Sequence, residues 1–195
     1  MSKLSKRQIQ GQTSRDKLLD AATRLFHENG YQAVTVNDIC EAAQLTKGAF
    51  YHHFDSKEAL YQHLYTPQLD TYLASHFSIS EDADGKTLLL ALADATLSFS
   101  EEIGREMTSL SITVMLNRGT SHLFTEGRVH TRLLHQALSQ SQAGNQLKCE
   151  GSEHELMLIY SCLMVGFLVK WASLADESNF DWHNLLQREM QLMFC

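Results

Sequence analysis

A chain of 195 residues and 22.1 kDa, with 44% hydrophobic and 20% charged residues, can bury a hydrophobic core, which excludes a small scaffold peptide and a largely disordered chain. One proline and ten glycines leave few helix breakers, so the composition favours an all-α fold. The formal net charge of -7, taken as an average, argues against a protein that coats nucleic acid or an anionic membrane.

The four cysteines are scattered without a C-x-x-C pair, and no apolar leader follows the basic N-terminus. These features indicate neither a disulfide framework nor a secretory signal, so we expect a cytoplasmic protein. Residues 156–169 carry no charge, but this stretch is short for a membrane span. We therefore expect a buried helix there and no membrane contact.

Residues 1–13 contain three basic and no acidic side chains, which predicts a flexible basic arm. Thr13 and Asp16 have the spacing of a helix cap, and Asn29-Gly30 supplies a stop. The apolar residues between them recur at helical spacing and predict the first helix: Leu18, Leu19, Ala22, Leu25 and Phe26.

Three further helix caps follow within 24 residues: Thr35 with Asp38, Thr46, and Asp55 with Glu58. The second helix spans about two turns and ends near residues 44–45, and the third covers 47–54. Two short helices joined by a tight turn and preceded by a longer helix have the proportions of a helix-turn-helix. In that motif the later short helix lies in the DNA major groove.

Helical periodicity gives the helix over 47–54 two faces. Phe50 and Phe54 lie four residues apart and are predicted to point inward. The outward residues suit DNA, because they offer a cation, a close backbone approach and ring or hydroxyl donors: Lys47, Gly48, Tyr51 and His52. The same pattern fits a solvated helix, and spacing alone leaves the two interpretations open.

The run from Gly30 to Leu60, which includes Thr35-Val36-x-Asp38-Ile39 and Leu45-Thr46-Lys47-Gly48-Ala49-Phe50-Tyr51-His52-His53-Phe54-x-Ser56-Lys57-Glu58, resembles the N-terminal domain of TetR-family transcriptional regulators. The resemblance covers between a quarter and a third of the chain. It implies a two-domain, all-helical homodimer that represses transcription at a palindromic operator. It further implies release when a small molecule occupies the C-terminal domain.

The resemblance also implies roles for single residues of the motif. Thr35 and Lys57 would contact phosphates from the ends of the second and fourth helices. Tyr51 and His53 would contact mainly phosphates, whereas Lys47 and His52 would lie nearest the bases. The whole implied DNA-binding set is Thr35, Thr46, Lys47, Gly48, Tyr51, His52, His53 and Lys57.

The fourth helix contains Pro67, the only proline, which should bend or interrupt it. We place a domain boundary there, between a DNA-binding domain over 14–66 and a ligand-binding and dimerisation domain over 67–195. Helical patterns follow over residues 86–103, 105–117, 121–142, 153–175 and 181–195.

The pattern over 153–175 is apolar on nearly all sides, and the pattern over 181–195 has one apolar stripe. Two such helices per chain predict a four-helix homodimer interface, with a purely intramolecular core as the alternative.

An effector pocket is expected among the preceding helices and the inner face of 153–175. The tentative lining is Phe99, Met107, Leu110, Met115, Phe124, Leu134 and Trp171, each of which also suits plain core. Arg105, Arg128 or Arg132 could meet an acidic ligand or lie at the surface.

Metal and enzyme functions are not indicated. The sequence has no H-E-x-x-H, G-x-S-x-G, P-loop or G-x-G-x-x-G pattern, so we expect no metal, no cofactor and no catalysis. The alternatives to a repressor are an activator, or a ligand-binding or protein-interaction module whose helix-turn-helix contacts another protein.

The charge is divided between the two halves. Residues 1–66 carry eight basic and seven acidic side chains, whereas residues 67–195 carry eight basic and sixteen acidic ones. Residues 1–24 contain six basic and two acidic side chains. The acidic average therefore does not argue against DNA binding by the N-terminal part.

Overall fold

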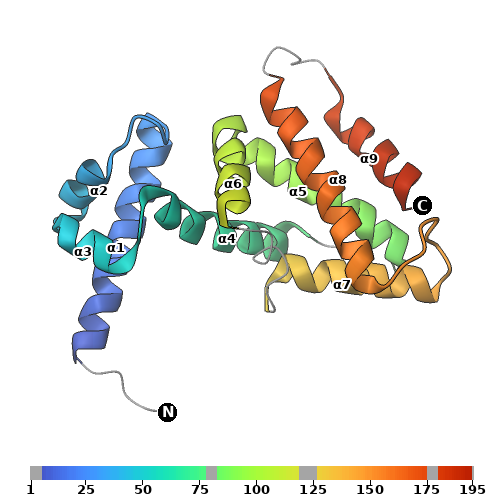
Figure 1. Cartoon of the computed structure of the whole chain (residues 1–195), viewed down its shortest axis with the longest axis horizontal. Coiled ribbons are helices and arrows are strands. Elements are labelled where there is room, and N and C mark those ends of the chain that lie inside the picture. The colour runs from blue at the N-terminus through green and yellow to red at the C-terminus, as the bar shows by residue number, and fades with distance from the viewer. Residues whose placement is uncertain (1–5, 78–82, 119–126, 175–179, 195) are drawn as a thin grey trace. The chain divides into compact units, whose positions relative to one another are not determined.

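The computed structural model describes residues 6–77, 83–118, 127–174 and 180–194, and the regular elements of these ranges are all α-helices (Figure 1). The expected all-α fold is confirmed. The chain divides into two compact units, residues 1–67 and residues 68–195.

The first unit contains α1 (Lys6–Asn29), α2 (Val36–Ala43), α3 (Lys47–His53) and the beginning of α4 (Lys57–His76). Helix α1 begins at Lys6, so the expectation of a flexible arm over residues 1–13 is wrong for 6–13; residues 1–5 lie outside the described residues. Most residues from Lys6 to Gln12 are good helix formers without proline, so the helix continues past the predicted cap.

Residues with positive φ end α1 and α2 near the positions that the sequence predicts. Gly30 has φ +76 and donates its N–H to the Phe26 carbonyl, which ends α1. Gln44 has φ +55, and its N–H binds the carbonyls of Cys40 and Glu41, which ends α2. The interruption that we considered at Pro67 does not occur, because α4 continues through this residue from Lys57 to His76. A proline removes one backbone N–H, and the hydrogen bonds of the flanking turns remain.

The core of the first unit is a layer of apolar side chains between α1 and the short helices. Rings of Phe26, Tyr31 and Tyr61 pack with centroids 5.0 to 6.3 Å apart. The fully buried residues come from all four helices: Leu18, Ala22, Ile39, Phe50 and Leu60. This packing fixes α3 on the unit with Phe50 inward.

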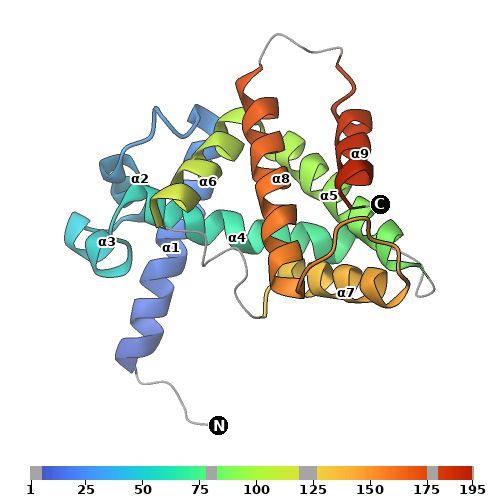
Figure 2. The ribbon, with the colours of Figure 1, turned by 45° about the vertical axis from the view of Figure 1, so that its right-hand side comes forward.

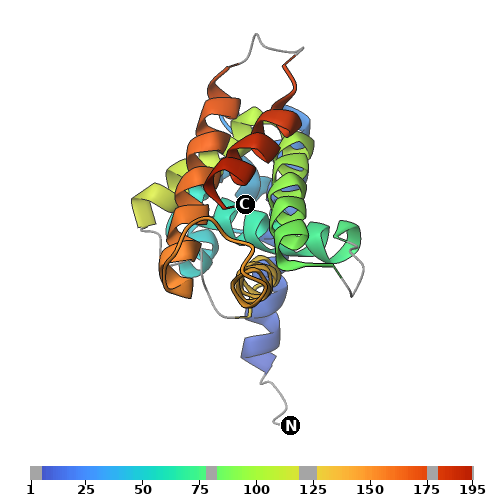
Figure 3. The same cartoon turned by 90° about the vertical axis from the view of Figure 1, so that its right-hand side faces the viewer.

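The second unit contains the end of α4, α5 (Gly85–Ile103), α6 (Arg105–Arg118), α7 (Val129–Ala143), α8 (Glu153–Ser173) and α9 (Trp182–Met193). Helices α5, α8 and α9 lie alongside one another, and α7 crosses near the start of α8 (Figures 2 and 3). A Cβ at Gly85 would lie 2.2 Å from the Ser141 backbone nitrogen, so only glycine allows α5 to approach α7 this closely.

Helix α7 begins later than the pattern over 121–142 predicts. Gly127 has φ +90, a conformation that favours glycine and is not helical, and the helix starts two residues later at Val129. Residues 119–126 lie outside the described residues.

Helix α8 is long and apolar enough to cross a membrane by composition, and its inner face packs within the unit. Its fully or nearly buried residues include Leu156, Tyr160 and Met164. Leu158 and Val169 stay exposed at 39% and 46%, and Cys162 is exposed between them. One apolar stripe of α8 therefore has no cover within the described chain.

His183 joins α9 to α5. Its Nδ1 lies 2.6 Å from Oδ1 of Asp94, and its Nε2 lies 3.0 Å from Oε2 of Glu101. Burial lowers the pKa of His183, but the hydrogen bonds and charges of the two carboxylates outweigh burial and hold this pKa above its ordinary value. The His183 imidazole therefore links the two helices, and its protonated form is favoured by both carboxylates.

We expect His183→Gln to remove a pH-dependent part of the stability. A raised pKa gives stabilisation that is fully present below the ordinary histidine pKa and is lost as pH rises through the folded-state value. The melting temperature of the native chain should thus exceed that of the variant most below the ordinary histidine pKa, and the gap should close as pH rises through the raised pKa of His183. Exposed His76 serves as a control in His76→Gln; a pH-independent gap for His183→Gln would contradict the assignment.

Candidate DNA-binding site

Helix α3 presents the predicted recognition residues on one exposed face. Phe50 is fully buried and Phe54 nearly so, as predicted. Lys47, Gly48 and His52 are exposed, and Tyr51 is 56% exposed. A short helix anchored by one aromatic side and open on the other can enter a DNA groove.

Two of the residues that are predicted to contact DNA, Thr35 and Thr46, cap α2 and α3. Thr35 Oγ1 accepts the Asp38 N–H at 3.2 Å and donates to Asp38 Oδ2 at 2.7 Å. Hydrogen bonds from the Thr35 backbone and hydroxyl hold the pKa of Asp38 below its ordinary value. Thr46 Oγ1 accepts the Ala49 N–H at 3.2 Å. Both threonines are exposed, so these caps fix the helix ends at the surface.

His53 and Lys57 are less accessible than the other predicted contacts. His53 is half-buried; burial first, then the neighbouring His52 and Arg15, lower its pKa. The structure thus gathers six of the eight residues along α3 and its cap, with Thr35 and Lys57 at the starts of α2 and α4. Their contacts with DNA remain predictions.

Lys57 holds the loop between α1 and α2. Its ammonium donates to the Tyr31 carbonyl at 2.8 Å and to the Val34 carbonyl at 2.7 Å, and lies 3.9 Å from the centroid of the Tyr31 ring. The Tyr31 hydroxyl donates to Glu58 Oε1 at 3.1 Å. Burial and the Glu58 charge raise the pKa of Tyr31, so it stays a donor. Sequence spacing gave no sign of this network, because its partners lie 26 and 23 residues from Lys57.

Lys57→Met should therefore lower the free energy of unfolding by about 1.5–3 kcal/mol, because two charge-assisted hydrogen bonds are lost while the apolar stem remains. Urea unfolding measures the change. Lys47→Met is the matched control, since Lys47 is exposed and its ammonium is expected to contribute little to the free energy of unfolding. Equal losses in the two variants would show that Lys57 does not act as a clamp.

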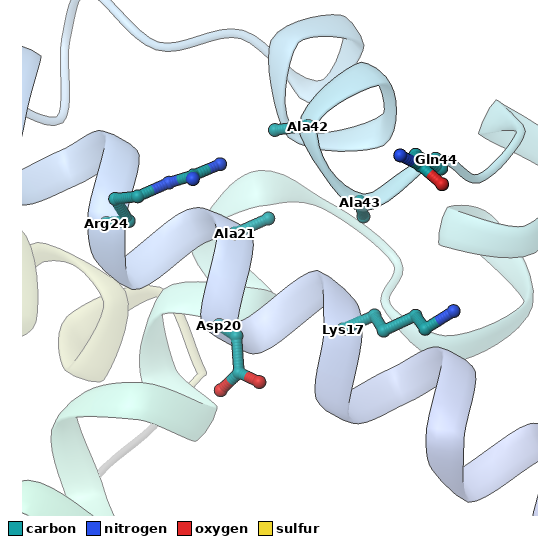
Figure 4. Close-up of a pocket in the computed structure, with 7 residues that line it drawn as sticks. All are labelled: Lys17, Asp20, Ala21, Arg24, Ala42, Ala43 and Gln44. Carbon is teal, nitrogen blue, oxygen red and sulfur yellow. The ribbon is translucent and has the colours of Figure 1, made fainter.

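A pocket of about 390 Å³ lies between α1 and α2 and also borders Gln44. Lys17 and Arg24 extend along its sides, and Asp20 points away from the α2 side (Figure 4). The floor is made of small side chains: Ala21, Ala42 and Ala43. None of the predicted site residues lines it.

The tentative effector residues occupy different environments. Phe99, Leu134 and Trp171 are buried, whereas Met107, Leu110 and Met115 are half-buried. Phe124 lies outside the described residues. Whether these residues contact a ligand remains a prediction.

Two of the arginines considered for an acidic ligand have protein partners. Arg105 donates to the carbonyls of Trp171 and Leu174 and so caps the end of α8. Arg128 Nε donates to Asp70 Oδ2 at 3.4 Å. Both side chains therefore bind other parts of the protein, which argues against a role for them in binding a ligand.

Comparison with known proteins places the site in a family context. Residues 18–64 match the family described as bacterial regulatory proteins, tetR family. The chain is 40% identical over 79 residues to the HTH-type transcriptional repressor KstR2 of Rhodococcus jostii, which covers 40% of this chain and 39% of that protein. It is 46% identical over 61 residues to the transposon Tn10 TetC protein of Escherichia coli, covering 30% and 31%.

These curated relatives are therefore matched over less than half of their length. The whole chain resembles solved structures at low identity. Salmonella enterica GusR has a TM-score of 0.56 at 20% identity and 97% coverage of both chains. The fatty acid degradation regulator FadR of Bacillus halodurans has a TM-score of 0.57 at 18% identity, covering 98% of this chain and 96% of FadR. At such identity the likeness shows a shared fold.

Proposed function

We propose that this chain, whose residues 18–64 match the tetR family of bacterial regulatory proteins, is a cytoplasmic transcriptional repressor without enzymatic activity. It binds a palindromic operator as a homodimer in this proposal and leaves the operator when a small molecule binds. The family match and the geometry of α3 support the DNA-binding part.

The observation that carries the proposal is the exposed face of α3. A lysine, a glycine, a tyrosine and a histidine lie on one side of a helix whose other side is fixed by Phe50. Gly48 has no Cβ, so the backbone at this position can approach DNA closely. A Cβ there would meet no close contact within the protein, but it would add bulk toward the groove. Lysine can bind guanine edges or phosphates, and tyrosine can donate to phosphate oxygens.

The homodimer is proposed to form through α8 and α9. Exposed apolar residues of α8 follow one stripe, and α9 adds Leu192 and Met193 beside its buried side. Apolar surface of this kind on a regular helix favours isologous pairing with a second copy. Two DNA-binding units about one helical turn apart, roughly 34–36 Å, would then reach successive major grooves.

Release is proposed to act through α4, which runs from Lys57 to His76 across the boundary of the two units. An effector that binds one arrangement of the second unit better would shift the population of dimers away from the DNA-binding spacing. The pocket residues Phe99, Met107, Leu110, Met115, Phe124, Leu134 and Trp171 remain its proposed lining.

The proposal is tested by capturing genomic DNA fragments with the purified full chain and sequencing them. We expect enrichment of an inverted repeat, because a twofold dimer reads two equal half-sites. The His52→Ala variant should shift or abolish the enrichment. Recovery of fragments without a shared sequence, identical for both proteins, would refute sequence-specific regulation.

A further inference from the structure

A second cationic group lies on the DNA-binding unit outside the predicted contact set. Arg15 of α1 donates from Nη2 to Nδ1 of His63 in α4 at 3.1 Å. Its guanidinium also lies 5.5 Å from the centroid of the Phe54 ring, at the end of α3. Three helices thus hold one guanidinium at the C-terminal end of α3.

Arg15 supplies the fixed positive charge at this place, because an arginine side chain stays protonated in proteins. Burial first, then His52 and Arg15, lower the pKa of His53 and favour its neutral form. The hydrogen bond to His63 uses one of the five N–H donors of the guanidinium. An anion beside Arg15 would be attracted by the guanidinium charge and could accept hydrogen bonds from its other N–H groups.

The length of α3 relates this group to the groove. From Lys47 to His53 the helix rises on the order of 9 Å, at 1.5 Å per residue. The major groove is about 12 Å wide, and the N-terminal residues of a recognition helix contact base edges inside it. Lys47 lies at that end of α3, and Arg15, at the other end, is placed to reach a phosphate at the edge of the groove.

We propose that Arg15 binds a phosphate of the DNA backbone, and that His63 and Phe54 hold its guanidinium in place. The inference rests on the proposed DNA-binding function and adds a contact from α1, beyond those of α2, α3 and α4. A planar guanidinium with several donors suits a phosphate group.

The test compares Arg15→Gln with Arg24→Gln. The two arginines lie nine residues apart on α1, which is two and a half turns, and therefore on opposite faces. Arg24 is exposed and lines the pocket toward α2 (Figure 4), so its variant controls for net charge. Fluorescence anisotropy would give the affinity for a captured fragment and for a random-sequence duplex across a salt series.

Arg15→Gln should weaken binding to both duplexes several-fold and make the slope of log K against log salt shallower by about 0.9, as for one lost phosphate contact. Arg15→Lys should keep the native slope, which a purely structural role would not predict. Arg24→Gln should leave the slope unchanged. A native slope in Arg15→Gln, or the same change in Arg24→Gln, would overturn the inference.

The outcomes also separate this inference from the proposed function. If Lys47→Ala abolishes preference for the captured fragment while Arg15→Gln binds as the native chain does, only the phosphate contact fails. If the native chain shows no preference for any sequence, the proposed regulator fails, and the random duplex still tests Arg15. If no duplex is bound, both are refuted.

Discussion

Lys47→Ala is expected to weaken operator binding by about 1–3 kcal/mol, roughly 5- to 150-fold, without unfolding the chain. Lys47 is the first residue of α3 and is exposed, so its removal costs little stability. The variant would lack the contact that the Lys47 ammonium is proposed to make with a base edge or a phosphate. Anisotropy titration at fixed salt measures the affinity, and thermal unfolding checks the fold.

The matched control is Lys17→Ala, which removes an exposed lysine from α1 beside the α1–α2 pocket. It changes the net charge equally and is expected to alter affinity little. If Lys47→Ala binds the operator as tightly as the native chain, or no more weakly than Lys17→Ala, the assignment of α3 as the recognition helix is wrong.

Val169→Asp is expected to dissociate the proposed dimer. Val169 is 46% exposed in the single chain, so a carboxylate there remains hydrated and the fold should persist. In a dimer through α8 the carboxylate would be buried without a partner, at a cost of about 3–5 kcal/mol. Light scattering should report the mass of one 22.1 kDa chain for the variant and of two chains for the native protein.

Leu116→Asp tests whether any exposed apolar position would give the same result. Leu116 is 64% exposed and lies on α6, outside the proposed interface. Its variant should remain dimeric. A native-like mass for Val169→Asp, at concentrations where the native chain is dimeric, would exclude α8 as the interface. The free thiol of Cys162, exposed on the same helix, should react more slowly in the native dimer than in Val169→Asp.

Locally encoded features of the fold are predictable from the sequence. The caps at Thr35 and Thr46 depend on residues three positions away, and both are present. The inward placement of Phe50 follows from helical periodicity. The start of α1 at Lys6 and the start of α7 at Val129 are less predictable, because helix formers extend the first and a glycine with positive φ delays the second.

Contacts between distant segments could not be read from the sequence. Lys57 meets two loop carbonyls more than twenty residues away, and Arg15 meets His63 across 48 positions. Arg105 was equally open to a ligand or a surface role, and it binds the end of α8 only because α6 and α8 pack together. These interactions arise from the packing of helices, which single-residue spacing does not specify.

The central claim, that two copies of α3 read a palindromic operator, is tested most directly by the affinity for a symmetric captured operator and for the same duplex with one half-site scrambled. The dimer account predicts two chains on the symmetric duplex. It also predicts a large loss of affinity on the scrambled one, since one recognition helix loses its base contacts. Equal affinity for the two duplexes, with one chain bound to each, would contradict it.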